Sequence, residues 1–221
     1  MHNPHLQFAS RLLCLIMLSV AVFSVVQAQP SISDGSHLYA SCGTCHAPKA
    51  WGSMDGAIPN LAGQNRRYLA KQMALFRSGV RIDSAMQVVA THPSIDNQHN
   101  VIALTDYLSR LDWNPRSVTG SGEHLRVGQE TYTHICAACH GADGRGEAGN
   151  WVPRIAGQHY PYLRLQIDVA AAFHRDLAPP EMTGALRSMG VRQKDALADY
   201  VSRLGNSEVL SDSDPYDGPP R

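Results

Sequence analysis

The chain has 221 residues, which is enough for one or two domains, and its 43% hydrophobic content is typical of globular proteins. Its 19 basic and 19 acidic residues balance, so no net charge favours nucleic acid as a partner. The composition therefore excludes fibrous, largely disordered and strongly nucleic-acid-binding classes of protein.

The segment 1–28 has the pattern of a secretory signal peptide. Arg11 precedes an apolar run at 12–26, and small residues ending at Ala28 offer a cleavage site. The run is shorter than the roughly 20 residues that a membrane-spanning helix needs, and an uncleaved anchor is the alternative interpretation. We expect cleavage after Ala28 and export to the periplasm.

Three segments of the remaining chain occur twice, 93 or 94 residues apart. The first copies are CGTCH at 42–46, PNLAGQ at 59–64 and DYLSRL at 106–111. The second copies are CAACH at 136–140, PRIAGQ at 153–158 and DYVSRL at 199–204. Self-similarity of this kind indicates two copies of one structural unit.

The repeat predicts two tandem domains, domain 1 at 29–112 and domain 2 at 122–205. The segment 113–121 between them contains the Pro, Ser and Gly residues of a linker, and acidic residues with Pro and Gly at 206–221 predict a flexible tail. Apolar residues recur at helical spacing in three segments, which are 68–79, 100–111 and 193–205. No alternating strand pattern of useful length occurs, and we predict an all-α fold.

All four cysteines of the mature chain lie in the two C-x-x-C-H motifs: Cys42, Cys45, Cys136 and Cys139. Four cysteines in an exported chain would ordinarily predict two disulfides, but this spacing predicts covalent attachment of haem. Two thiols three positions apart on a helical turn can reach the two vinyl groups of one haem. The adjoining residue, His46 or His140, then lies under the iron as an axial ligand. We expect two covalently bound haem c groups.

Two other interpretations compete with haem attachment. Each C-x-x-C pair could be a redox-active dithiol or half of a zinc site, but a zinc site would need ligands from both domains and would leave the repeat unexplained. The segment 144–149 reads G-x-G-x-x-G, which alone suggests a dinucleotide-binding turn. No strand is predicted before it, so we interpret it as a spacer around the haem edge.

The sixth ligand of each iron must come from elsewhere, and methionine is a common partner of histidine. Met86 lies 40 residues after His46, and Met182 lies 42 residues after His140, so both occupy matching places in the repeat. We expect both in a loop between two helices, as ligands of the first and the second iron. The alternative is that they are core methionines, and Met189 competes with Met182 for the second iron.

Pro59 and Pro153 each follow the motif histidine by 13 residues. With these prolines both halves resemble class I cytochromes c, and the tandem pattern resembles the di-haem cytochrome c4 family over essentially the whole mature chain. The resemblance implies two class I domains related by pseudo-two-fold symmetry, with each proline carbonyl accepting a hydrogen bond from the ligand histidine. It also implies close crossings of the first and last helices at these residues: Gly35 with Tyr39 and Tyr107, and Gly128 with Tyr132 and Tyr200.

Ligation by histidine and methionine fills both axial positions, so neither iron would offer a site to a substrate. We expect an electron carrier and not an enzyme, whose partners are redox proteins and include neither nucleic acid nor a small-molecule substrate. The resemblance implies a periplasmic shuttle between a quinol-oxidising complex and a terminal oxidase or reductase, with transient encounters and peripheral association with inner-membrane complexes.

Two alternative functions stay open. The chain could be the electron-accepting subunit of a periplasmic dehydrogenase, because the haem chemistry would be the same. A di-haem peroxidase, or a dehydrogenase acting on a sulfur compound, would need an open axial position, and the paired methionines argue against it. Five basic residues of domain 1 suggest a solvated face, a neighbourhood for haem propionates or a docking patch for an acidic partner: Arg66, Arg67, Lys71, Arg77 and Arg81.

Overall fold

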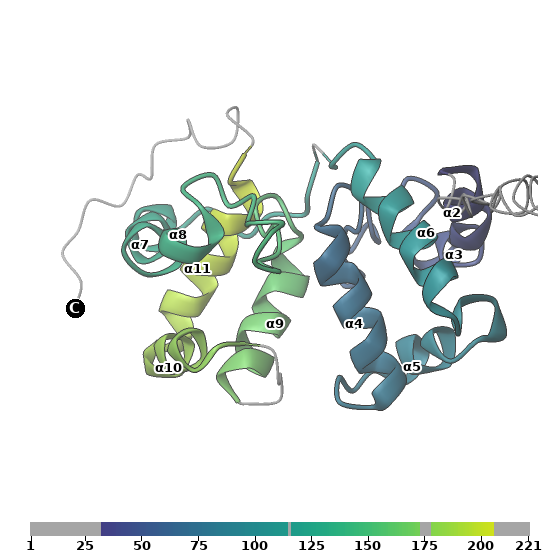
Figure 1. Cartoon of the computed structure of the whole chain (residues 1–221). Coiled ribbons are helices and arrows are strands. Elements are labelled where there is room, and N and C mark those ends of the chain that lie inside the picture. Colours follow the sequence, from purple (N-terminus) through teal and green to yellow (C-terminus); the bar gives the residue numbers. More distant parts are fainter. Residues whose placement is uncertain (1–31, 115, 173–177, 206–221) are drawn as a thin grey trace, which may run out of the picture.

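The computed structural model describes these residues: 32–114, 116–172 and 178–205. They form two helical domains side by side (Figure 1), and the predicted signal peptide at 1–28 and tail at 206–221 lie outside them. Within the described residues the β contacts amount to an isolated bridge between Glu147 and Val152. No helix in this part of the chain has the length and the apolar character needed to cross a membrane. The prediction of an all-α fold is confirmed.

The α-helices of the two domains correspond in order, and each domain has one further turn at a different place. Domain 1 contains α2 (Ile32–Tyr39), α3 (Gly43–His46), α4 (Arg66–Ser78), α5 (Ser84–Ala90), a 3-10 turn (Pro93–Ile95) and α6 (Gln98–Arg110). Domain 2 contains α7 (Leu125–Thr131), a π-helical turn (Tyr132–Cys136), α8 (Ala137–His140), α9 (Tyr160–Ala171), α10 (Pro180–Ser188) and α11 (Val191–Arg203). Helices α4 and α9 face each other across the boundary between the domains (Figure 1).

In each domain the first helix crosses the last one at a glycine. A Cβ atom at Gly128 of α7 would lie 2.1 Å from the carbonyl oxygen of Ala196 in α11. A Cβ atom at Gly35 of α2 would lie 2.4 Å from the corresponding oxygen of Ala103 in α6. Aromatic pairs flank the crossings, with ring centroids 5.9 and 5.7 Å apart: Tyr39 with Tyr107, and Tyr132 with Tyr200. Only glycine allows this approach, as the resemblance implied.

Each domain encloses its own hydrophobic core. In domain 1 the core includes Leu69, Met73 and Phe76 of α4 and Val101, Leu104 and Leu108 of α6. In domain 2 it includes Leu163 and Ile167 of α9, Leu186 of α10, and Leu197 and Val201 of α11. These residues recur at three- and four-residue steps, so each helix buries one face. Helix α4 begins after the capping side chain of Asn65 and ends at Gly79, whose φ of 74° is left-handed.

The domains meet through the duplicated AGQ segments, and the contact is reciprocal. The side chain of Gln64 binds the main chain of Arg154, since its Oε1 accepts from the Arg154 N–H (2.9 Å) and its Nε2 donates to the Arg154 carbonyl (2.8 Å). Gln158, the counterpart of Gln64, binds the main chain of Asn60 in the same way, with both hydrogen bonds at 2.9 Å. A surface that pairs with its own repeat in this manner is what a pseudo-two-fold axis requires.

Trp113, just before the linker proline, fills the space between the two AGQ glycines. Its ring carbon Cε3 lies 3.5 Å from the place of a Cβ at Gly63, and its Nε1 lies 2.7 Å from the place of a Cβ at Gly157. The guanidinium of Arg154 stacks over the same ring, 4.1 Å from its centroid. Because neither glycine carries a side chain, the indole packs directly against both domains.

Five basic residues of domain 1, called the basic row below, do not form an open face: Arg66, Arg67, Lys71, Arg77 and Arg81. Three of its residues contact domain 2: Arg67 donates to the Gly149 carbonyl, Lys71 lies over the Trp151 ring, and Arg81 donates to the side chains of Tyr162 and Gln166. The other two bind within domain 1: Arg77 donates to the carbonyls of Ala90 and Ile95, and Arg66 pairs with Asp106. The row is therefore largely part of the domain interface, because α4 faces α9.

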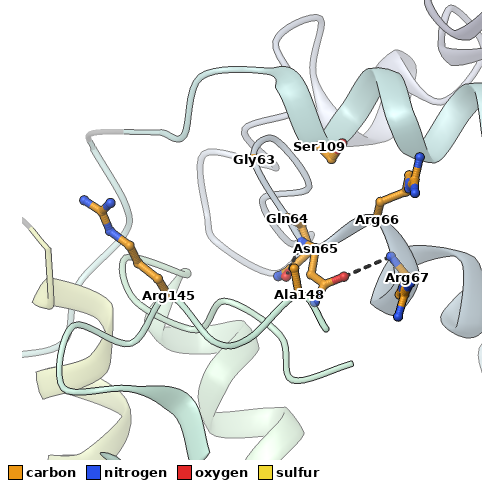
Figure 2. A pocket seen from close by; sticks show the side chains of 8 residues that line it. All are labelled: Gly63, Gln64, Asn65, Arg66, Arg67, Ser109, Arg145 and Ala148. Carbon is orange, nitrogen blue, oxygen red and sulfur yellow. Dashed lines mark hydrogen bonds between the residues drawn. The ribbon is translucent and has the colours of Figure 1, made fainter. Parts of the chain in front are cut away.

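A cavity of about 330 Å³ lies at this interface (Figure 2). Residues of both domains line it: Gly63, Gln64, Asn65, Arg66, Arg67, Ser109, Arg145 and Ala148. In Figure 2, Gln64 and Asn65 lie in the middle. Arg145, from the loop that follows α8, lies on one side of them, and the two arginines that begin α4 lie on the other. Side chains of both domains thus share one space beside the AGQ contact.

Candidate haem sites

The two C-x-x-C-H motifs each occupy one helical turn. In domain 1 the N–H groups of Cys45 and His46 both donate to the Cys42 carbonyl, at 3.2 and 2.9 Å. Cys42 lies just before α3, which contains Cys45 and His46, and Cys136 likewise lies just before α8, which contains Cys139 and His140. The first thiol of each motif is half-buried, the second is exposed, and no described cysteine is in a disulfide. Before haem attachment, burial raises the pKa of the Cys136 thiol to about 11.

The histidine of each motif is buried and held by the predicted proline. The Nδ1–H of His46 donates to the Pro59 carbonyl at 3.1 Å, and that of His140 donates to the Pro153 carbonyl at 3.2 Å. Burial lowers the pKa of both imidazoles, opposed by this hydrogen bond. A neutral imidazole with its proton on Nδ1 has its lone pair on Nε2, which is the form that ligates iron.

The loop from histidine to proline follows the same path in both domains. Ala50 and Gly144 take equivalent places with left-handed φ of 59° and 67°. Their carbonyls each accept two hydrogen bonds from the following segment, from Leu61 and Ala62 in domain 1 and from Ile155 and Ala156 in domain 2. Gly52 and Gly146 are also equivalent, and their N–H groups donate to the carbonyl of the motif histidine at 3.0 and 2.8 Å. The G-x-G residues thus shape a haem loop, and the first copy keeps one of these two glycines.

Tyr132 lies four residues before Cys136, whereas Tyr39 lies three residues before Cys42, and a π-helical turn accommodates the extra residue. The Ala137 N–H donates to the Tyr132 carbonyl five residues earlier, which widens the turn by one residue. The tyrosine hydroxyls still reach equivalent targets, because Tyr39 donates to the Ala47 carbonyl and Tyr132 to the Gly141 carbonyl, both at 2.6 Å. The insertion therefore leaves the start of the haem loop in place.

The candidate methionines lie in short helices, and the expectation that both lie in loops is wrong. Met86 is in α5, where the Asp83 side chain caps the helix and accepts from the Met86 N–H at 2.9 Å. Met182 is in α10, which begins at Pro180, a residue suited to the first helical turn. Both side chains are half-buried and pack at the edge of their domain core. Met189 follows α10 and lies within the core, with 6% of its surface exposed.

One residue that the sequence reasoning missed connects three parts of the molecule. His159 is 2% exposed, and its Nε2 donates to the Trp51 carbonyl of the first haem loop at 2.7 Å. Its Nδ1 accepts from the Val118 N–H of the linker at 3.0 Å. Burial lowers the pKa of His159, which keeps the ring neutral as both contacts require. The signal in the sequence was a difference between the repeats, since Asn65 holds this place in domain 1.

Comparisons with known proteins agree with this geometry. A family model described as Cytochrome c matches the chain at 32–111 and again at 126–205. A thiosulfate dehydrogenase electron acceptor of Stutzerimonas stutzeri is 29% identical over 84% of this chain and 93% of its own length. A cytochrome c4 of Azotobacter vinelandii is 26% identical over 72% of this chain and 80% of its own length. The crystal structure of reduced recombinant cytochrome c4 from Pseudomonas stutzeri has a TM-score of 0.70 and 21% identity, covering 79% of this chain and 98% of that chain.

The matches cover both repeats, and each repeat contains one C-x-x-C-H motif with its buried histidine. Each domain therefore carries one covalently bound haem c. Two haems on one chain give it two sites for one-electron exchange with redox protein partners. The chain belongs to the cytochrome c family, as a tandem di-haem electron carrier of the cytochrome c4 type.

Proposed function

We propose that this protein is a periplasmic electron carrier whose irons have two internal axial ligands each, His46 with Met86 and His140 with Met182. The observation that carries the proposal occurs twice: a buried histidine held by a proline carbonyl, in a domain whose core edge bears a methionine helix. With these residues as ligands, neither iron would offer a binding position to peroxide or another substrate. The proposal therefore includes the absence of catalysis at either iron.

The residues present fit haem c. Thiols for two thioether bonds are available in each domain, from Cys42 and Cys45 or from Cys136 and Cys139. Among the described residues, the hydrogen bonds of the motif histidines involve Nδ1, which leaves Nε2 for the iron. When bound, the haem supplies reversible one-electron transfer. The protein attaches it, fixes the imidazole and keeps the imidazole neutral through burial.

The test of saturated ligation combines a haem count with optical and ligand-binding spectroscopy of the purified protein. We expect two haems per chain, both low-spin in each oxidation state, with spectra that do not change on addition of cyanide or peroxide. A high-spin haem, or turnover of peroxide, would contradict the carrier function and favour the peroxidase alternative.

The donor and acceptor divide the proposal into two forms. In the first form the protein shuttles between a quinol-oxidising complex and a terminal oxidase or reductase, touching the membrane complexes only peripherally. In the second form it is the electron acceptor of a periplasmic dehydrogenase. The second form is favoured by the relative named thiosulfate dehydrogenase electron acceptor, which this chain matches over 93% of that protein's length.

Stopped-flow reduction distinguishes the two forms. The oxidised protein is mixed with membranes and quinol, or with a thiosulfate dehydrogenase and thiosulfate, and haem reduction is followed at several salt concentrations. Rapid reduction by the membranes alone supports the shuttle, whereas rapid reduction by the dehydrogenase alone supports the acceptor. Osmotic shock of cells should release the protein, and a salt wash should free any fraction that stays with the membrane.

A further inference from the structure

The reciprocal glutamines of the interface reach the haem sites of the opposite domains through single peptide groups. The carbonyl of Pro153 and the N–H of Arg154 belong to one peptide group. The carbonyl accepts from Nδ1–H of His140 at 3.2 Å, and the N–H donates to Oε1 of Gln64 at 2.9 Å. A domain 1 side chain is thus joined to the axial histidine of domain 2 by two hydrogen bonds and one amide.

The same connection runs in the other direction. The carbonyl of Pro59 accepts from Nδ1–H of His46 at 3.1 Å, and the N–H of the same peptide group, on Asn60, donates to Oε1 of Gln158 at 2.9 Å. The two connections are related by the pseudo-two-fold axis. Each axial histidine is therefore linked to a glutamine of the other domain.

The orientation of each glutamine amide is determined by its neighbours. Oε1 of Gln64 also accepts from the Asn65 N–H at 2.8 Å, and Oε1 of Gln158 accepts from the His159 N–H at 3.0 Å. Because two main-chain N–H groups face each Oε1, a flipped amide would set donor against donor. Both glutamines are 4% exposed, so water does not compete for these bonds.

Hydrogen bonds in series polarise one another. An acceptor at the N–H of a peptide group makes its carbonyl oxygen more negative and a better acceptor. A better acceptor at Nδ1–H makes the imidazole a more electron-rich ligand, which stabilises ferric over ferrous haem. Each glutamine is therefore placed to lower the reduction potential of the opposite haem.

We propose that Gln64 and Gln158 are crossed positioning residues, Gln64 for the haem of domain 2 and Gln158 for the haem of domain 1. They couple the electronic properties of each site to the intactness of the domain interface. Loss of the interface contacts would raise both potentials, because both glutamines would leave their peptide groups. The inference rests on the proposed ligation by His46 and His140.

The test is a redox titration of the Gln64→Ala and Gln158→Ala variants of the full-length haem-loaded protein. Proton NMR of the haem methyl groups, assigned to a domain by their contacts, gives a potential for each haem. For Gln64→Ala we expect the ratio of reduced to oxidised haem 2 at a fixed ambient potential to rise roughly threefold, about 30 mV. Haem 1 should move less. Gln158→Ala should show the mirror pattern.

The matched control is Asn65→Ser. The Asn65 side chain donates across the same interface to the carbonyls of Glu147 and Val152 and touches neither peptide group that carries a proline carbonyl, while the main-chain N–H of this residue, which binds Oε1 of Gln64, is kept in the variant. Serine keeps a capping oxygen for α4. We expect Asn65→Ser to leave the difference between the two potentials unchanged, and a shift of haem 2 equal to that of Gln64→Ala would overturn the proposal.

The crossed pattern of potential shifts, in which each variant shifts the haem of the other domain, distinguishes this proposal from a merely structural role of the glutamines. Equal shifts of both haems in either glutamine variant, a larger shift of the haem in the variant's own domain, or no shift would each refute it. If Gln64→Ala does not incorporate haem, Gln64→Leu keeps the volume without the oxygen and is expected to shift haem 2 in the same way. Failure of the ligand assignment is distinct, because the unmodified protein would then lack a low-spin histidine–methionine spectrum.

Discussion

Replacing Gly146 with alanine should damage the second haem site and spare the first. A Cβ at this position would lie 2.4 Å from the Pro153 carbonyl oxygen and 2.5 Å from the Pro153 carbonyl carbon. Both atoms are main chain, so no side-chain rotation relieves the contact. The Pro153 oxygen is the atom that accepts the hydrogen bond from His140.

The expected loss of folding stability in Gly146→Ala has two contributions. Gly146 has a φ of 71°, and an L-residue in the left-handed region costs about 1–2 kcal/mol. Overpacking against the main chain adds about 1–3 kcal/mol. Relief of the clash moves the Pro153 carbonyl by roughly 1 Å, which takes its hydrogen bond to His140 beyond normal length. Loss of about 1 kcal/mol of ferric stabilisation raises the potential of haem 2 by about 40 mV.

Denaturant unfolding measures the loss of stability, and a redox titration that resolves the two haems measures the rise in the potential of haem 2. Gly149→Ala is the control within the same motif, because the nearest atom to its Cβ is the Glu147 Oε1 at 3.9 Å and its φ is not left-handed. We expect Gly149→Ala to stay within about 0.5 kcal/mol of the unmodified protein. Unchanged stability of Gly146→Ala, or an equal rise in the potential of haem 1, would refute the reasoning.

Three further predictions concern individual side chains. Met182→Ala should lose the methionine-to-iron charge-transfer band of one haem, whereas Met189→Ala should keep both bands and lower stability by about 2–5 kcal/mol, as optical spectra and melting curves will show. Because burial lowers the pKa of His159 below its ordinary 6.5, the unfolded chain binds that proton more tightly. Stability should therefore fall as the pH drops below 6.5, and His159→Gln should reduce that slope in denaturation series on both sides of this pH. Arg81→Ala removes a charged donor that bridges the domains and should cost about 1.5–3 kcal/mol, while Arg66→Ala, at an exposed ion pair, should cost under about 1 kcal/mol by the same unfolding assay.

Much of the haem chemistry could be predicted because its determinants are local or repeated. The thiols and imidazole of C-x-x-C-H share one helical turn, so their spacing alone indicates haem attachment. The resemblance to class I cytochromes c implied that the carbonyls of Pro59 and Pro153 hold the histidines, and the structure contains both contacts. Helical spacing of apolar residues indicated the fold class for the same reason, since 3.6-residue periodicity is visible along the chain.

The two short helices that contain the candidate methionines, α5 and α10, could not be predicted from local sequence. Met86 and Met182 were expected in a loop between two helices, at matching places in the repeat. The cap at Asp83 and the proline that begins α10 make these segments helical instead. Packing against the domain core supports helices that are too short to be stable alone.

The sequence alone determined that this chain repeats one haem-binding helical unit, because that information lies in spacings of a few residues. Only the tertiary structure decided how the two units act on each other. The Gln64 contact with Arg154 spans 90 residues and the His159 contact with Trp51 spans 108. Such contacts leave no periodic trace in the sequence, because they form only when two separately folded surfaces meet.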